Sequence, residues 1–378
     1  MLKAVRLLVI LGLAIAIGRP TRGQAQDFNG SSKAVFVMTN DAVQNSVIAY
    51  PRNSDGSLGR GHKFFTGGRG SGGTVDPLAS QGSLTLSTDG SLLFAVNAGS
   101  GELSVFRVFG NFLWLADVVS CGGSEPVAVA QYGDLVYLVN AGGTNNIVGF
   151  RLTRDQKLKR IPHANYLLST GNTGPGSIAF SRSDGQLLLV TEKVTNKIDT
   201  FRVHADGTLG PIVTKPSAGP GAFAVQFAPN GAALVVETGP AGGTNASAIS
   251  SYAADAGGGL SVISPSVATQ GAATCWLQVT PNGQFVYTAN SGTSNISGFS
   301  IGTHGSLTPL PGTIVGNLPA GSTDLDVTVS SNGKFLYTLN TGTGTIGIFE
   351  IQKDGTLLSL GDVDGLPAKA GLNGIAAN

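Results

Sequence analysis

Hydrophobic and polar residues alternate in short runs along the chain, and residues 83–108, SLTLSTDGSLLFAVNAGSGELSVFRV, show the pattern most clearly. An alternating run leads to the turn Asp89-Gly90, a second apolar run ends at Asn97, and a third carries Phe106. Alternation with a period of two around an Asp-Gly turn is typical of a β-hairpin. The segment therefore predicts three antiparallel strands.

The same pattern returns about every 50 residues. The aromatic residue of the third run recurs as Tyr50, Phe106, Phe150, Phe201, Tyr252, Phe299 and Phe349. The residue that ends the second run recurs as Asn40, Asn97, Asn140, Glu192, Glu237, Asn290 and Asn340. Further Asp-Gly turns, such as Asp206-Gly207, add a fourth strand to the unit. A four-stranded unit of this length is typical of a propeller blade, so we predict an all-β, seven-bladed β-propeller of four-stranded antiparallel blades.

The two ends of the repeat predict how the ring closes. The first copy begins at Ala34 on its second strand, with no inner strand before it, whereas Gly371 to Ala377 reads as an inner strand without a blade. Pairing this C-terminal strand with the N-terminal strands removes an exposed sheet edge. We expect one blade to be built from both ends of the chain.

The N-terminus has the pattern of an export signal. Basic residues precede the apolar run Leu7 to Ile17, and Gly23 and Ala25 fit a small-x-small cleavage site. A membrane anchor is the alternative, but the run is short for a bilayer span. We predict a signal peptide over residues 1–25 and a single propeller domain over residues 26–378. The mature protein is then a periplasmic or secreted monomer with no stable membrane span.

Composition narrows the range of partners. Charged residues make up 12% of the chain, the net charge is +1, and no basic run is present, so a phosphate-neutralising surface for nucleic acid is not expected. The two cysteines, Cys121 and Cys275, belong to copies separated by several blades. A disulfide needs much closer Cα atoms, so we expect free, buried thiols.

Antiparallel strands place the loop after strand two and the connection into strand one at the same end of the ring, and propeller ligands typically bind over the central channel at that end. The repeat places all four histidines on or beside the outer strands: His62, His163, His204 and His304. A Ser-His-Asp triad or a histidine metal site is therefore not expected. We predict no metal and no cofactor.

Glu192 and Glu237 stand where the other copies carry asparagine, and two interpretations are open. In one, the asparagines cap turns and the glutamates are solvated variants. In the other, Glu192 is a general base or ligand-orienting group, and Lys193 stabilises an oxyanion. The candidate catalytic residues are Glu192, Lys193 and Glu237. The candidate ligand-binding residues are Arg69, Asn97, Asn140, Asn290, Asp324 and Asn340.

Two other features suggest ligands. The segment Gly67 to Gly73 has the composition of a backbone-amide anion cradle, but it lacks the spacing of a phosphate loop and is better explained as a flexible loop. The asparagine ring, together with the acidic residues Glu192, Glu237 and Asp324, has the oxygen ligands of a Ca²⁺ site. Turn chemistry accounts for the asparagines without a metal.

Three copies, DGSLLFAVNAGSGELSVF, NGQFVYTANSGTSNISGF and NGKFLYTLNTGTGTIGIF, resemble the seven-bladed lactonase-like propellers, which include 6-phosphogluconolactonases and carboxymuconate-lactonizing enzymes. The resemblance implies a lactone substrate. Glu192 is kept within the sequence Val-Thr-Glu-Lys, but the family's inner-strand Pro-His pair reads Pro126-Val127 or Pro175-Gly176, so its histidine is missing. The charged loop of the third copy reads Asn140 to Asn145, without charge, and an expected arginine is serine at position 291.

Two classes of function are therefore open. The first is an exported lactonase-like enzyme that hydrolyses or forms a sugar-acid or related lactone, with Glu192 as the base. The second is a non-catalytic propeller that binds a carbohydrate, peptide or cell-surface partner on its Asn/Gly-rich face. A small-molecule lactone or a glycan is the expected ligand.

Overall fold

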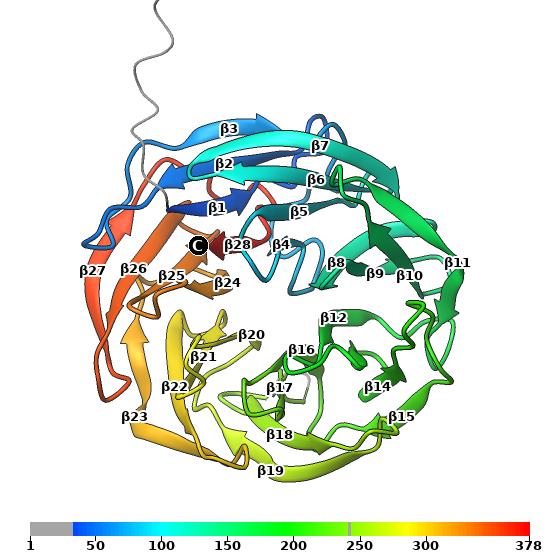
Figure 1. Ribbon diagram of the computed structural model, residues 1–378. Coiled ribbons are helices and arrows are strands. Elements are labelled where there is room, and N and C mark those ends of the chain that lie inside the picture. The colour runs from blue at the N-terminus through cyan, green and yellow to red at the C-terminus, as the bar shows by residue number, and fades with distance from the viewer. Residues whose placement is uncertain (1–32, 241–242) are drawn as a thin grey trace, which may run out of the picture.

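The computed structural model describes residues 33–240 and 243–378, which form seven four-stranded antiparallel sheets arranged in a ring (Figure 1). The predicted seven-bladed propeller is confirmed. The predicted signal peptide lies outside the described residues. Within them, no helix could span a membrane.

The blades are numbered from the first described strand, and each is given from its inner to its outer strand. Blade 1 contains β28 (Ile375–Ala377), β1 (Ala34–Met38), β2 (Ser46–Pro51) and β3 (His62–Phe65). Blade 2 contains β4 (Leu84–Leu86), β5 (Leu92–Asn97), β6 (Glu102–Phe109) and β7 (Phe112–Ser120). Blade 3 contains β8 (Ser124–Tyr132), β9 (Leu135–Gly142), β10 (Asn146–Leu152) and β11 (Leu158–Leu167). Blade 4 contains β12 (Pro175–Phe180), β13 (Leu187–Glu192), β14 (Lys197–Arg202) and β15 (Val213–Pro216).

The remaining three blades follow the same order. Blade 5 contains β16 (Ala222–Phe227), β17 (Ala233–Glu237), β18 (Ala248–Ala254) and β19 (Leu260–Ala268). Blade 6 contains β20 (Thr274–Val279), β21 (Phe285–Asn290), β22 (Asn295–Ile301) and β23 (Leu307–Asn317). Blade 7 contains β24 (Asp324–Val329), β25 (Phe335–Asn340), β26 (Thr345–Ile351) and β27 (Leu357–Val363).

The ring closes as the two chain ends predicted. Strand β28 pairs antiparallel with β1, with Val37 opposite Ile375, so the first and last described strands share blade 1. The paired strand is shorter than the predicted segment and covers only Ile375–Ala377. This pairing covers the inner edge of β1, which would otherwise be exposed, and gives blade 1 its fourth strand.

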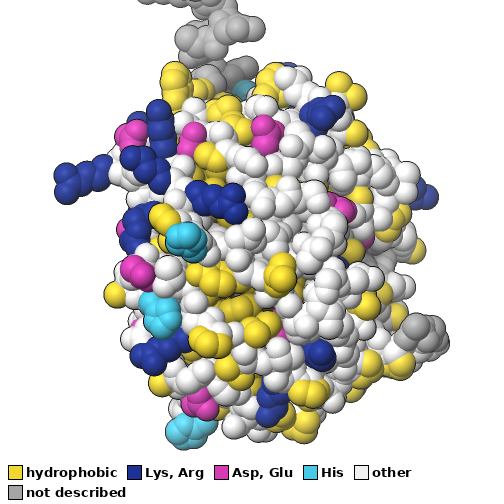
Figure 2. Space-filling model, turned by 90° about the vertical axis from the view of Figure 1, so that its right-hand side faces the viewer, with side chains coloured by type: hydrophobic (Ala, Val, Ile, Leu, Met, Phe, Trp, Pro, Cys, Tyr) yellow, Lys and Arg dark blue, Asp and Glu magenta, His cyan; other side chains and the backbone are white. Residues whose placement is uncertain are grey.

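The second strand of each blade is apolar on both faces because neighbouring blades cover it. All six residues of β5 and of β25 are buried, whereas the outermost strand β27 is largely exposed. Packing between blades is visible where Tyr337 of β25 lies in one apolar cluster with Val35 of β1 and Ile375 of β28. The outermost strands contain many exposed residues, with a few buried ones between them in β11 and β23. Figure 2 shows one side of the outer surface, mostly uncharged, with more of its basic side chains on the left of the view and others scattered elsewhere.

Two further predictions are confirmed. Cys121 and Cys275 are both free and buried. All four histidines belong to outer parts of the blades. His62 begins β3, His163 lies in β11, His204 follows β14, and His304 lies in the turn before β23.

Candidate functional site at the channel mouth

The asparagines that end the second strands are structural residues, each fully buried. In blade 2, Asn97 donates to the hydroxyl of Ser104 (2.7 Å) and accepts from the hydroxyl of Thr66 (2.7 Å). Ser104 closes the triangle by donating to the Thr66 carbonyl (2.7 Å). We call this arrangement the polar staple, because it ties the connection between two blades to the second and third strands of the following blade.

The staple recurs around the ring. In blade 6, Asn290 donates to Ser297 (2.8 Å), which in turn donates to the Thr269 carbonyl (2.7 Å). Asn140 and Asn340 make related bonds, to the Cys121 carbonyl (3.2 Å) and to Thr345 (3.1 Å). The side chains of these predicted ligand residues are therefore engaged inside the blades.

Glu192 and Glu237 occupy the same buried position, with exposed fractions of 0% and 1%. The interpretation of these residues as solvated turn variants is wrong. Glu237 accepts hydrogen bonds from Ser250 (2.6 Å) and Ser266 (2.7 Å) and from the amide of Gly219 (2.8 Å). It therefore holds the connection that leads into β16.

Glu192 forms a carboxyl pair with Asp199, which replaces the serine of the staple. Glu192 accepts from the amide (2.9 Å) and hydroxyl (2.7 Å) of Ser169 and from the hydroxyl of Thr195, and it is hydrogen-bonded to Asp199. Burial, followed by the neighbouring Glu192, raises the pKa of Asp199 to about 7. Two carboxylates this close do not both ionise readily, so Asp199 keeps its proton and donates to Glu192.

The glycine-rich segment is held along its length rather than free. Its consecutive amides donate as follows: Gly68 to Thr66 Oγ1 (3.3 Å), Arg69 to Ser100 Oγ (2.8 Å), Gly70 to the Asp41 carbonyl (2.7 Å), Ser71 to Asn40 Oδ1 (3.0 Å) and Gly72 to the Asn40 carbonyl (2.9 Å). With these amides occupied, the segment is neither an anion cradle nor a flexible loop. The Arg69 side chain extends from it, exposed.

Beyond this segment, the connection from β3 to β4 crosses the central channel, and we call residues 76–81 the plug. The plug joins blades 1 and 2 in sequence, yet it bonds to the inner strands of blades 3, 4 and 6. Ser80 donates to the Val127 carbonyl of β8 (2.8 Å), and the Gln81 amide donates to the Gly176 carbonyl of β12 (2.9 Å). Trp276 of β20 donates through Nε1 to the Ser80 carbonyl (3.0 Å).

Lys193 points to this plug from the end of β13. Its ammonium donates to the carbonyls of Ala79 and Pro175 (3.3 Å) and lies 5.0 Å from the centre of the Phe223 ring. Burial lowers the pKa of Lys193, and the nearby Asp76 opposes that shift. An ammonium has three donors, so one remains after the two carbonyls are bound.

Asp76 is the acidic partner at the channel mouth. Burial raises the pKa of Asp76 to about 6, with Lys193 acting in the opposite direction. The ion pairs within 4.0 Å in residues 33–240 and 243–378 do not include these two groups. Asp76 also accepts from Asn373 Nδ2 (3.2 Å). The charged ends of Asp76 and Lys193 therefore influence each other without forming a direct ion pair.

Asp324 lies deeper beside the same mouth. It is fully buried, and neither of its carboxyl oxygens has a hydrogen-bond partner among the described residues. Burial raises its pKa well above the ordinary value. Asp324, Asp76 and Lys193 all influence the Cys275 thiol, whose pKa burial raises. The structure thus gathers Lys193, Asp76 and Asp324 at one place, apart from Glu192, Glu237 and Arg69.

The sequence reasoning did not select Asp76 as a site residue. Two signals for it were the unusual length of the connection that carries it, Thr66 to Gln81, and the place of that connection at the end of the ring where propeller ligands typically bind. That connection also brings the plug into the channel. The described residues contain no cluster of three or more metal-ligating side chains.

The fold is that of a seven-bladed propeller, with Asp76 and Lys193 near one end of a plugged channel. The family "Lactonase, 7-bladed beta-propeller" matches residues 29–242 and 235–322. The chain therefore belongs to the seven-bladed lactonase propeller family, as the repeated motifs indicated.

Solved structures share the fold. A candidate 6-phosphogluconolactonase from Bacteroides uniformis has 18% identity and a TM-score of 0.67 over 92% of this chain and 100% of its own. A periplasmic gluconolactonase from Pseudomonas aeruginosa has 16% identity and a TM-score of 0.69 over 91% and 98%. At these identities the likeness concerns the fold. No curated protein sequence matches the chain.

Proposed function

We propose that this protein is an exported lactonase that opens an uncharged sugar-type lactone at the channel mouth. The observation that carries the proposal is the proximity of Lys193 to Asp76 of the plug. Burial shifts the pKa of each group. Family membership supports a small-molecule lactone as the substrate.

The chemistry assigns one role to each group. The Asp76 carboxylate takes a proton from a water molecule as that water attacks the lactone carbonyl carbon. The free N–H of Lys193 donates to the carbonyl oxygen, which becomes negative in the tetrahedral intermediate. The ring C–O bond then breaks, and the ring oxygen receives the proton from Asp76. The product is an open hydroxy acid.

The acidity of Asp76 suits this role. A general base works best when its pKa lies near the working pH. The ordinary aspartate value is far below neutrality, and burial brings the pKa of Asp76 to about 6. The carboxylate is then ionised at neutral pH and is a stronger base than an exposed aspartate.

Glu192 acts in this proposal as a positioning residue rather than as the base. Its carboxylate is bound by Ser169 and Thr195, and it directly precedes Lys193. Fixing the end of β13 fixes the direction of the Lys193 side chain. Glu237 does the same for the connection into β16, where Phe223 lies against the Lys193 ammonium.

The balance of charge at the mouth favours an uncharged substrate. One cation, Lys193, stands among the acidic groups Asp76 and Glu125, with Asp324 buried behind them. A phosphorylated lactone would meet more negative than positive charge. Among the predicted ligand-binding residues, Arg69 alone has an exposed side chain, since Asp324 is fully buried and the four asparagines are engaged in the blades.

Export and state of assembly remain part of the proposal. The apolar N-terminal run and the periplasmic location named for the Pseudomonas aeruginosa gluconolactonase both support an exported protein. We propose that the mature chain is a monomer in the periplasm or outside the cell.

The test is lactone hydrolysis by the purified mature protein, followed by pH-stat titration of the released acid. D-glucono-1,5-lactone and its 6-phosphate are the matched substrates. We expect hydrolysis of the first above the spontaneous rate, and a loss of about a hundredfold or more in Asp76→Asn and in Lys193→Met. Asp41→Asn, an exposed aspartate on another loop, is the control and should keep full activity.

Two results would contradict the proposal. Full activity in Asp76→Asn would remove the proposed base. An absence of turnover with lactones of any ring size would favour the non-catalytic propeller that binds a carbohydrate or protein partner.

A further inference from the structure

A second cavity lies at the opposite end of blades 3 and 4 from the channel mouth. It has a volume of about 460 Å³, within the range of small-molecule sites. Gln186, which lines it, directly precedes β13, whereas Lys193 directly follows that strand. The two sites are therefore separated by the length of a six-residue strand, on the order of 20 Å.

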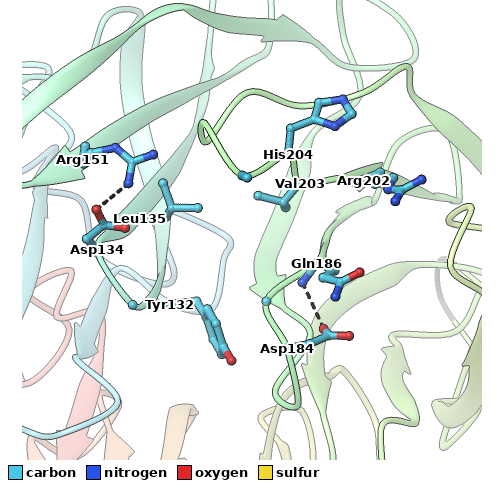
Figure 3. A pocket seen from close by; sticks show the side chains of 12 residues that line it. Tyr132, Asp134, Leu135, Arg151, Asp184, Gln186, Arg202, Val203 and His204 are labelled. Carbon is cyan, nitrogen blue, oxygen red and sulfur yellow. Dashed lines mark hydrogen bonds and ion pairs between the residues drawn. The ribbon is translucent and has the colours of Figure 1, made fainter.

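Two blades supply the two walls of this cavity, which we call the interblade groove. Figure 3 shows Leu135, Asp134 and Arg151 of blade 3 on one side and Val203, His204 and Gln186 of blade 4 on the other. Leu135 and Val203 give the groove an apolar centre, and polar side chains surround it.

One aromatic ring is fixed at the edge of the groove. Tyr132 is half-buried, and its ring lies against the backbone of Gly185, where an added Cβ would come within 2.1 Å of the ring. Its far side neighbours Phe180, with ring centres 6.1 Å apart. Gly185 also has a φ of +63°. A larger residue at this position would therefore be disfavoured both by the backbone conformation and by the Tyr132 ring. The ring is thus held ready as an apolar surface with a polar hydroxyl at its end.

The charges around the groove balance. Arg151 is ion-paired with Asp134, and the Asp184 carboxylate accepts from the Gln186 amide (3.0 Å) and from Ser181 (2.6 Å). The guanidinium of Arg202 has no hydrogen-bond or ion-pair partner within the described part of the chain. Its positive charge offsets the negative charge of Asp184, so the arginine and aspartate charges around the groove sum to zero.

We propose that the interblade groove binds a neutral saccharide. A sugar ring has an apolar face, which matches Tyr132 and the Leu135–Val203 centre. Its hydroxyls both donate and accept, which matches the mixed donors and acceptors of Arg202, Gln186 and Asp134. A phosphate or carboxylate finds no net attraction there, because Asp134 and Asp184 offset Arg151 and Arg202. The groove would hold the protein on a glycan while the channel mouth stays open.

The experiment uses the mature protein and three probes: D-glucose and maltose as neutral saccharides, and D-gluconate as an anion of the same size. Saturation-transfer NMR detects weak contact, and calorimetric titration gives the affinity. We expect millimolar binding of the neutral sugars. The affinity should fall about tenfold in Arg202→Gln, the loss of one hydrogen bond from a charged group, and further in Tyr132→Ala. A thermal melt of each variant confirms that it is folded.

The matched control is Arg182→Gln, an exposed arginine in the same β12–β13 hairpin that does not line the groove. This control and Lys193→Met should both bind maltose as the wild type does, which separates the groove from the proposed lactonase site. The proposal is overturned if no neutral sugar binds. It is also overturned if maltose affinity survives both groove variants, or if gluconate binds more tightly than glucose.

Discussion

The side-chain amide of Gln81 forms hydrogen bonds with both the carbonyl (2.9 Å) and the amide (3.3 Å) of Leu277, as a neighbouring strand would. Gln81 lies in the connection between blades 1 and 2, whereas Leu277 lies in blade 6. Its Nε2 also donates to Asp326 of blade 7 (3.0 Å). One residue therefore links blades across the channel.

Replacing Gln81 should destabilise the whole ring. In Gln81→Ala, the buried backbone groups of Leu277 and the Asp326 carboxyl lose partners that water cannot easily replace. We expect the free energy of unfolding to fall by about 2–3 kcal/mol, measured by urea denaturation. Gln44→Ala, at an exposed position, is the control and should change it little. Equal midpoints for the two variants would show that the plug is dispensable.

The carboxyl pair of blade 4 makes stability depend on pH. Because the pKa of Asp199 is raised to about 7, the folded protein keeps a proton that the unfolded chain has released above its ordinary value of 3.8. This contribution is fully present below the ordinary value and is lost as pH rises toward 7. One retained proton corresponds to about 1.4 kcal/mol per pH unit. The lowered pKa of Glu192 acts in the opposite direction, at more acidic pH.

The double variant Glu192→Asn with Asp199→Ser restores the neutral pair found in blades 2 and 6. We expect its unfolding midpoint in urea to decline less between about pH 4 and 7 than that of the wild type. The remaining slope should come from Asp76 and Asp326, whose pKa values burial raises to about 6 and about 7. An unchanged slope in the double variant would mean that the pair does not share a proton.

Hydrolysis at the channel mouth should depend on the ionisation of Asp76. Because the carboxylate is the active form, kcat/KM should fall as pH drops below about 6. In Lys193→Met the opposing positive charge is gone, so the pKa of Asp76 should rise and the acidic limb of the residual activity should move to higher pH. A pH profile of both proteins, measured with glucono-1,5-lactone, checks the direction. A limb that moves to lower pH would place another group in this role.

The two thiols should react only when the fold opens. Cys121 and Cys275 are buried, and burial raises the pKa of both, which lowers the share of reactive thiolate. We expect Ellman's reagent to react slowly with the native protein. In denaturant without reductant, it should react rapidly with both thiols. Fast labelling of the native protein would indicate that the plug beside Cys275 opens readily.

The architecture was accessible from the sequence because every blade repeats the same local signals. Turns such as Asp89-Gly90 and the residues at the Asn97 position mark each copy, and the unpaired Gly371–Ala377 segment indicated closure. The burial of Glu192 and Glu237 could not be predicted from the sequence. Their environment depends on Ser169 and Gly219 of the preceding interblade connections and on Thr195, Ser250 and Ser266 from later parts of the same blades. A repeat pattern contains no information on such contacts.

The same limit applies to the channel mouth. Asp76 and Lys193 are more than a hundred residues apart, and they meet only because the connection after β3 leaves its own blade. Its glycine-rich composition, TGGRGSGG, is that of an unstructured loop. Its hydrogen bonds to Asn40 and Asp41 and to the opposite inner strands give it a fixed course. The local sequence pattern therefore predicted the propeller fold. The position of Asp76 beside Lys193 depends instead on the course of the long connection.

The pairing of β28 with β1 means that blade 1 can be completed only after the strands of the other six blades have been synthesised. Until Ile375–Ala377 has been made, blade 1 has only three strands and an open inner edge, and the ring is incomplete. A chain cut before Ile375 would leave β1 with an exposed backbone edge. The three residues of β28 are therefore a small part of the fold on which the closure of the whole ring depends.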